Sequence, residues 1–205
     1  MNLNAYAVIL ASTSPRRKQL LGSLNLSFQL NSPGFEEKLE EGENASDYVK
    51  RNGEGKARSI AKEISSGLHN ASSDKKHVII GADTVVVLDG MILQKPKSAD
   101  EAVAMLHQLS GRTHQVFTGF SLSFQKEAGG EFATVSEVMK TDVSFKILTD
   151  DEIKDYVSTG EPMDKAGAYG IQGKAAYFVN KISGSYTNVM GLPLTEVYEQ
   201  LISLP

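Results

Sequence analysis

Residues 6–24 read YAVILASTSPRRKQLLGSL. Tyr6–Leu10 is apolar and rich in strand-forming residues, whereas Arg16–Leu24 has the spacing of a helix. Between them, Ser14 is suited to cap the helix and Pro15 to occupy its first turn. The stretch therefore predicts a strand, a tight loop and a helix, which is the opening unit of an α/β fold.

The same alternation continues along the chain. Further helices are predicted over Ser46–Ile64, Ala99–Leu109, Asp150–Val157 and Leu194–Ile202, with Ser98 and Thr149 as caps. Strands are predicted over Phe28–Leu30, His77–Ile80, Val85–Leu88, Met91–Leu93, Gln115–Phe124, Phe132–Phe145 and Ala176–Ile182. A hairpin around Gly129-Gly130 is expected to join the two longest strands, so the sheet is predicted to be mixed.

Two stretches are expected to interrupt regular structure. Gly53 and Gly55 fall inside a predicted helix, and such a local conflict sometimes marks a close approach of the backbone to another group. Gly160–Gly173 is rich in glycine and is predicted to be irregular.

The composition sets limits on the class of protein. A chain of 205 residues fits one large domain or two lobes that share a core. The net charge of −4 disfavours general binding to nucleic acids, and the absence of cysteine excludes disulfides and thiolate metal sites. Ala5–Ala11 is too short to span a membrane and follows no basic region, so a cytoplasmic protein without membrane contact is expected.

The first stretch with chemical potential is Ser12-Thr13-Ser14-Pro15-Arg16-Arg17. The first N–H groups of a helix are free to bind an anion, and Arg contacts phosphate oxygens in a bidentate manner. These residues favour a triphosphate cradle. A helix cap followed by a solvated basic turn explains the same residues equally well.

The second stretch is Gly81-Ala82-Asp83-Thr84, expected between two apolar strands. An Asp at a strand end can bind a hard cation or take a proton from water. Taken alone, the pattern favours an Asp that satisfies the N–H groups of a turn. The apolar flanks would hold Asp83 rigidly, which strengthens the functional interpretation.

The third stretch, Glu161–Gly173, combines acidic, basic and amide side chains with glycines. Glycines let a backbone approach a ligand closely, and Gln172 could read the edge of a base because an amide both donates and accepts. Lys56, Lys95 and Lys165 could add point charges for phosphate. A flexible surface loop with exposed lysines is the alternative.

The histidines do not add a site. His69, His77, His107 and His114 lack metal-ligand spacing, and the chain contains neither a P-loop nor a G-x-S-x-G motif. They are interpreted as surface or core residues. The three stretches together predict phosphate held by Arg and Lys, with carboxylates available to Mg²⁺ or Mn²⁺.

Five motifs in this order resemble the Maf family of nucleoside triphosphate pyrophosphatases. They are Ala11–Arg17, Gly81–Val86, Gly111–Val116, Glu161–Gly173 and Gly184–Pro193. The resemblance implies hydrolysis of a nucleoside triphosphate to the monophosphate and pyrophosphate, with Mg²⁺ or Mn²⁺ as cofactor and often a homodimer. It implies a single domain over residues 1–205, of the Maf and Ham1 type. Its elongated, twisted, mixed sheet would be flanked by helices, with a cleft between two lobes.

The resemblance also implies roles for individual residues. Catalysis would fall to Asp83 and Lys95, with Asp83 as general base or metal-organising carboxylate. Phosphate or substrate binding would fall to Ser12, Ser14, Arg17, Lys56 and Lys165. The metal would be held by Glu37, Asp83 and Asp164.

Substrate choice is implied in the same way. Arg16, Thr84 and Gln172 match the subgroup that acts on dTTP and UTP, whereas the subgroup that acts on 7-methyl-GTP usually differs at the first two of these positions. One departure lies before Lys56, where Asn52-Gly53-Glu54-Gly55 replaces the usual helical surroundings of the family Lys.

Two further hypotheses remain open from the sequence. The chain could be a nucleotide-binding regulator with little turnover, since the family name has been associated with septum formation. Alternatively, its substrate could be a modified pyrimidine or purine triphosphate. Release of pyrophosphate from a panel of triphosphates distinguishes these hypotheses.

Overall fold

The structure is a computed structural model that describes residues 5–68 and 74–205. Its helices and strands, in chain order, are β1 (Tyr6–Ala11), α1 (Pro15–Gly22), β2 (Phe28–Asn31), α2 (Ala45–Ser65), β3 (Lys76–Leu88), β4 (Met91–Leu93), α3 (Ala99–Leu109), β5 (Thr113–Gln125), β6 (Phe132–Phe145), α4 (Asp150–Ser158), β7 (Val179–Ser183), α5 (Tyr186–Met190) and α6 (Leu194–Ile202). Short 3₁₀ turns occupy Glu161–Asp164, Ala166–Ala168 and Lys174–Phe178. His69 lies outside the described residues.

The strands form a mixed sheet in the order β2-β1-β3-β5-β6-β7, with β4 paired to β3. Strand β1 is parallel to β2 and to β3, whereas β4 is antiparallel to β3 and β7 is antiparallel to β6. The predicted α/β class with a mixed sheet and flanking helices is confirmed.

The chain divides into two compact units. The first comprises Met1–Asp83, Thr118–Val138 and Gly191–Pro205, and the second comprises Thr84–Phe117 and Met139–Met190. Strands β3, β5 and β6 contribute residues to both. The single domain of two lobes with a cleft between them stays a prediction.

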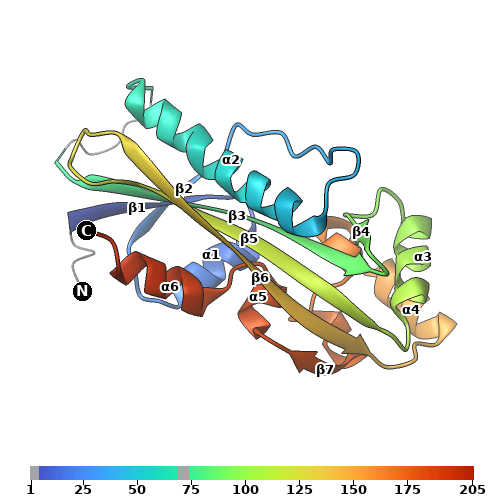
Figure 1. Cartoon of the computed structure of the whole chain (residues 1–205). Coiled ribbons are helices and arrows are strands. Elements are labelled where there is room, and N and C mark those ends of the chain that lie inside the picture. The colour runs from blue at the N-terminus through green and yellow to red at the C-terminus, as the bar shows by residue number, and fades with distance from the viewer. Residues whose placement is uncertain (1–4, 69–73) are drawn as a thin grey trace. The chain divides into compact units, whose positions relative to one another are not determined.

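In the first unit, α2 lies on one face of the strands, and α1 and α6 lie on the other (Figure 1). The core under α2 consists of Ile9, Ala11, Ala57, Ile60, Ala61 and Ile79. Ile9 and Ala11 are two residues apart on β1, so both face the same side of the strand. Ile60 and Ala61 follow Ala57 by three and four residues on α2, so the three share one face of the helix. Burial of this apolar stripe holds α2 against the sheet.

Glycines let α2 lie unusually close to the strands. A Cβ on Gly81 would fall 2.3 Å from the carbonyl oxygen of Gly53, and one on Gly119 would fall 2.4 Å from the carbonyl oxygen of Val49. One on Gly55 would fall 2.2 Å from the ring of Phe35. The glycines that conflict with a helix are thus explained by close packing.

The expected break at Gly81–Thr84 is wrong, because these residues lie inside the uninterrupted strand β3. In the sequence, Gly81 suggests a turn. In the structure, the absence of a Cβ at Gly81 lets the backbone of α2 lie close to β3. Asp83 is therefore held in the middle of a strand and not at its end.

Helix ends follow local capping chemistry. Ser14, Ser98 and Thr149 accept hydrogen bonds from backbone N–H groups at the starts of α1, α3 and α4, as predicted, and Thr149 forms a full capping box with Glu152. Asn44 caps α2 by accepting from the Asp47 N–H at 3.0 Å. In the described part of the chain, no helix has the combined length and apolar character needed to cross a membrane.

In the second unit, α3 packs against α4, and an aromatic cluster forms around Phe145. The strand expected over Ala176–Ile182 is only partly correct. Its first residues belong to the 3₁₀ turn, since Ala175 and Phe178 are buried at a spacing of three, and β7 begins at Val179. Helix α5 was not predicted from the sequence.

His114 in this cluster is expected to make the protein sensitive to acid. It is 1% exposed, its Nε2 lies 2.8 Å from the Tyr169 hydroxyl, and burial lowers its pKa from 6.5 to about 4. A lowered pKa in the folded state stabilises the fold above pH 6.5, and this contribution is lost as the pH falls towards 4. Between pH 7 and 5, the free energy of unfolding of the wild-type protein, measured in urea, should therefore fall by about 2 kcal/mol more than that of His114→Gln. Parallel pH profiles for the two proteins would contradict this.

Candidate active site

Asp83 is the centre of a buried polar cluster in the first unit. It lies on β3 with Gly81 on the same face, since alternate residues of a strand share a face. Its side chain is directed towards α2, and the residue is only 6% exposed. A carboxylate this deeply buried needs partners to remain charged.

Lys56 supplies the main counter-charge. Its Nζ lies 2.9 Å from Asp83 Oδ1 and 2.6 Å from Glu37 Oε1, and it donates to the Ala82 carbonyl oxygen at 3.0 Å. Lys56 is 4% exposed, whereas the Glu37 side chain is 38% exposed. The structure thus brings together three predicted site residues, with two carboxylates converging on one ammonium.

Sequence reasoning did not identify Asn52 as part of this cluster. Its Nδ2 donates to Asp83 Oδ2 at 2.8 Å, and the residue is fully buried. Tyr48, one turn earlier, is also buried. Burial raises its pKa, and a hydrogen bond with Asn52 acts in the opposite direction. A signal was present, because Tyr48, Asn52 and Lys56 follow the spacing of the apolar stripe of α2.

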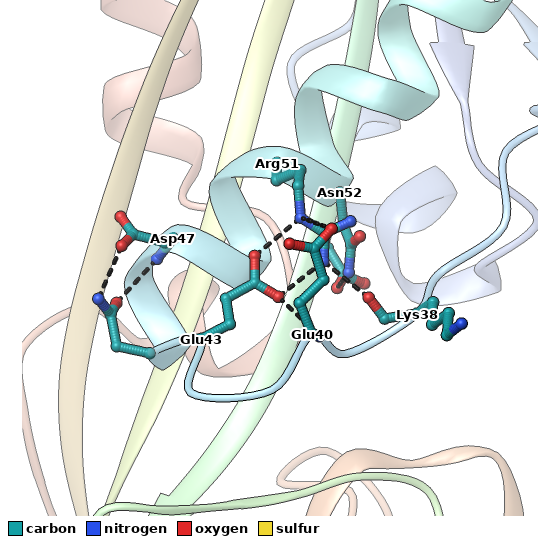
Figure 2. Close-up of polar contacts among 8 residues, drawn as sticks. Lys38, Glu40, Glu43, Asp47, Arg51 and Asn52 are labelled. Atoms are coloured by element: carbon teal, nitrogen blue, oxygen red, sulfur yellow. Dashed lines mark hydrogen bonds and ion pairs between the residues drawn. The ribbon is translucent and has the colours of Figure 1, made fainter.

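The loop of residues 32–43, which contains Glu37, is anchored to α2 by Arg51 (Figure 2). Arg51 donates from Nε to Glu43 Oε1 at 2.8 Å and from Nη2 to Glu43 Oε2 at 2.7 Å. It also donates to the Lys38 carbonyl oxygen at 2.7 Å. The hydrogen bond with Arg51 lowers the pKa of Glu43. This bidentate clamp holds the loop on the same helix that contains Lys56.

The Ser12–Arg17 segment forms the predicted loop between β1 and α1. Ser12 is buried and its Oγ accepts from the Ser14 N–H at 3.1 Å, while Ser14 caps the helix. A pocket of about 390 Å³ adjoins it, lined by Ser12, Thr13, Ser14, Pro15, Lys18, Leu30, Asn31 and Ser32. The pocket lies at the carboxyl ends of parallel strands β1 and β2, a usual position for ligands in α/β sheets.

The two arginines of this segment differ in environment. Arg16 is half-buried, whereas Arg17 is buried and donates from Nε to the Gly191 carbonyl oxygen at 2.7 Å. Burial lowers the pKa of Arg17, and the charges of Asp83 and Glu37 oppose that effect. Arg17 therefore lies within electrostatic reach of the Asp83 cluster.

The remaining predicted residues belong to the second unit. Lys95 and Gln172 are exposed, and Thr84 is half-buried on the face of β3 opposite to Asp83. Lys165 donates to Asp164 Oδ1 and to the Glu161 carbonyl oxygen, both at 2.7 Å.

The segments of Lys95 and Lys165 are adjacent within this unit. The Gly167 N–H donates to the carbonyl oxygen of Gln94, next to Lys95, at 3.2 Å. Glu161, for which no role was predicted, accepts from the Tyr156 hydroxyl and from the Lys174 N–H, both at 3.1 Å. These bonds give the Gly-rich segment a defined shape.

The metal ligands stay a prediction. Among residues 5–68 and 74–205, no three His, Asp or Glu side chains are grouped as a metal site. The carboxylate oxygens of Glu37 and Asp83 nevertheless both lie against the Lys56 ammonium group. Oxygen atoms are the ligands that Mg²⁺ and Mn²⁺ prefer. The donor chemistry at these two residues fits the cofactor.

A family model described as Maf-like protein matches residues 7–204. The chain belongs to the Maf family. The match covers the Ser12–Arg17 loop and the Asp83 cluster, as well as the Gly-rich segment of the second unit.

Curated Maf relatives are similar to the chain over nearly its whole length. A protein of Photorhabdus laumondii is 48% identical over 93% of this chain and 90% of its own length. A Geobacter protein is 47% identical over 95% of this chain and 94% of its own length. An Escherichia coli O157:H7 protein is 44% identical over 95% of this chain and 91% of its own length. Each is named a dTTP/UTP pyrophosphatase.

Among solved structures, the Staphylococcus aureus Ham1 protein gives a TM-score of 0.39 at 14% identity. The likeness covers 68% of this chain and 71% of that one. A likeness of this size adds nothing to the assignment.

Proposed function

We propose that this Maf protein hydrolyses dTTP and UTP, with modified pyrimidine nucleotides as further candidates, to the monophosphate and pyrophosphate. The observation that supports this most strongly is the Glu37–Lys56–Asp83 cluster, in which Lys56 and Asp83 are buried and which lies within electrostatic reach of Arg17. The names of the relatives support the same reaction and the same two substrates.

In the proposed reaction, Asp83 takes a proton from a water molecule that attacks phosphorus at the α–β bridge. The new P–O bond forms as the bridging P–O bond breaks, which releases the monophosphate and pyrophosphate. Lys56, whose Nζ lies 2.9 Å from Asp83 Oδ1, would hold the carboxylate in place for this proton transfer. Ser12, Ser14 and Arg17, with Lys56, Lys95 and Lys165, would bind the triphosphate and offset its charge.

Glu37, Asp83 and Asp164 are the proposed ligands of Mg²⁺ or Mn²⁺. The bound cation would compensate charge on the phosphate oxygens and orient them. The oxygen donors of Glu37 and Asp83, which already attract a cationic group, support this assignment.

Exchange of the two adjacent glutamates tests the role of Glu37. Glu37→Gln should lower the rate of pyrophosphate release by about 10- to 100-fold, because the amide weakens a charged hydrogen bond to Lys56 and removes a metal-binding charge. Glu36→Gln is the matched control and should remain close to wild type. Equal effects of the two substitutions, measured with UTP and Mg²⁺, would remove the assigned role.

Base selection is proposed to depend on Arg16, Thr84 and Gln172. Arg16→Ala and Thr84→Ala should each change the ratio of dTTP to GTP turnover by about 10-fold, because a lost hydrogen bond weakens discrimination between bases. The ratio is obtained from kcat/KM for each nucleotide. An unchanged ratio would exclude that residue from substrate choice.

The alternative of a regulator with little turnover makes a different prediction. Purified protein, Mg²⁺ or Mn²⁺ and a panel of triphosphates should yield pyrophosphate most rapidly from dTTP and UTP. Tight nucleotide binding without product would favour the regulator. A homodimer in the cytoplasm, without membrane or nucleic-acid partners, completes the proposal.

A further inference from the structure

Asn52 is a fully buried polar residue on the stripe of α2 that is otherwise mainly apolar. It precedes Lys56 by four residues, so both side chains leave the same face of the helix. Lys56 binds Asp83 Oδ1 at 2.9 Å, and Asn52 binds Asp83 Oδ2 at 2.8 Å. Each carboxylate oxygen thus has its own donor from α2.

The close packing of α2 makes this contact possible. Because Gly53 and Gly81 bring helix and strand backbones together, the short side chain of Asn52 spans the gap to Asp83. Lys56 alone would leave the second carboxylate oxygen without this fixed donor. The neutral amide therefore fixes the rotation of the carboxylate without neutralising its charge.

The other end of the Asn52 amide supports a specific role. Its Oδ1 is buried and accepts no hydrogen bond from any of the residues that the structure describes. Turning the amide over would place this oxygen against Asp83 Oδ2, where two acceptors repel each other. The fold thus tolerates an unpaired acceptor, which is normally unfavourable, while the donor stays on Asp83.

We propose that Asn52 is a positioning residue that orients the Asp83 carboxylate for proton transfer. The proposal deepens the proposed hydrolysis and rests on it. It also gives a reason for the unusual residue before Lys56, because Asn52 contacts the residue proposed as the base.

The test compares Asn52→Leu, which has similar volume but no donor, with Glu54→Ala. Glu54 also links α2 to the sheet, by accepting from the Ser136 hydroxyl at 2.7 Å, but this bond does not involve Asp83. With UTP and Mg²⁺, Asn52→Leu should lower kcat by about 10- to 100-fold and leave KM nearly unchanged, since a small misplacement of a reacting group slows chemistry. Glu54→Ala should keep the kcat of wild type. Asn52→Ala provides a second variant if the Leu protein does not fold.

Full kcat in a folded Asn52 variant would overturn the proposal, as would a parallel loss of kcat, substrate affinity and melting temperature. A crystal structure of the variant gives a readout that is independent of activity. The proposal expects the Asp83 carboxylate to turn so that Oδ2 leaves its present position while Oδ1 stays with Lys56, and an unmoved carboxylate would overturn it. If wild-type protein releases no pyrophosphate, the proposed hydrolysis fails, and the crystal structure alone decides whether Asn52 orients Asp83.

Discussion

Asp83→Asn is expected to lower the rate of pyrophosphate release from UTP by about 10²- to 10⁴-fold, the usual contribution of a general base. An amide cannot take up the proton of the attacking water. Its nitrogen is a hydrogen-bond donor and cannot accept from Lys56 or Asn52, which both donate to the Asp83 carboxylate in the wild-type protein. The substitution thus removes the base and the arrangement that holds it.

The measurement is steady-state release of pyrophosphate, together with a melting curve of each protein. The melting curve shows whether the substitution destabilises the fold, because the buried Lys56 loses the Asp83 carboxylate and keeps only that of Glu37. Asp89→Asn is the matched control, since Asp89 lies just after the same strand and pairs with Arg112 at the surface. Full turnover in folded Asp83→Asn would show that the role assigned to Asp83 is wrong.

Gly81→Ala should destabilise the protein by about 3 kcal/mol or more, at the upper end of the range for overpacked cores. The new methyl group would lie 2.3 Å from the Gly53 carbonyl oxygen and 2.7 Å from the Ala57 nitrogen. Both are backbone atoms, so α2 must move as a whole. Activity should fall as well, because the same helix contributes Asn52 and Lys56 to the Asp83 cluster.

Gly22→Ala is the control for Gly81→Ala. Apart from its chain neighbours and the backbone of its own helix, none of the described residues has an atom within 4 Å of a Cβ at Gly22, near the end of α1, and alanine is the better helix former. Urea unfolding should therefore show stability equal to or above wild type for Gly22→Ala. If Gly81→Ala unfolds at the wild-type urea concentration, α2 does not depend on this close approach.

Local chemistry explains what could be predicted of the fold. The start of α4 follows from Thr149 and Glu152, and the extent of α6 from its apolar spacing after Pro193, because these signals lie within a few residues. The continuity of β3 through Gly81 could not be predicted in this way. It depends on α2, whose contact with Gly81 is a tertiary one.

The candidate site shows the same limit. Family resemblance pointed to Glu37, Lys56 and Asp83, which the structure brings together, although their roles stay predictions. In the sequence, Asn52 is distinguished only as part of a departure from the family pattern. Its partner lies 31 residues away in the chain, so the sequence alone does not reveal that its amide binds a carboxylate.

The products formed from UTP distinguish a pyrophosphatase from other hydrolases of nucleoside triphosphates. Purified protein, UTP and Mg²⁺ would be followed by ³¹P NMR, which distinguishes the bond that is broken. We expect UMP and pyrophosphate in equal amounts from the first time point. Formation of UDP with orthophosphate, or no product with either Mg²⁺ or Mn²⁺, would contradict it.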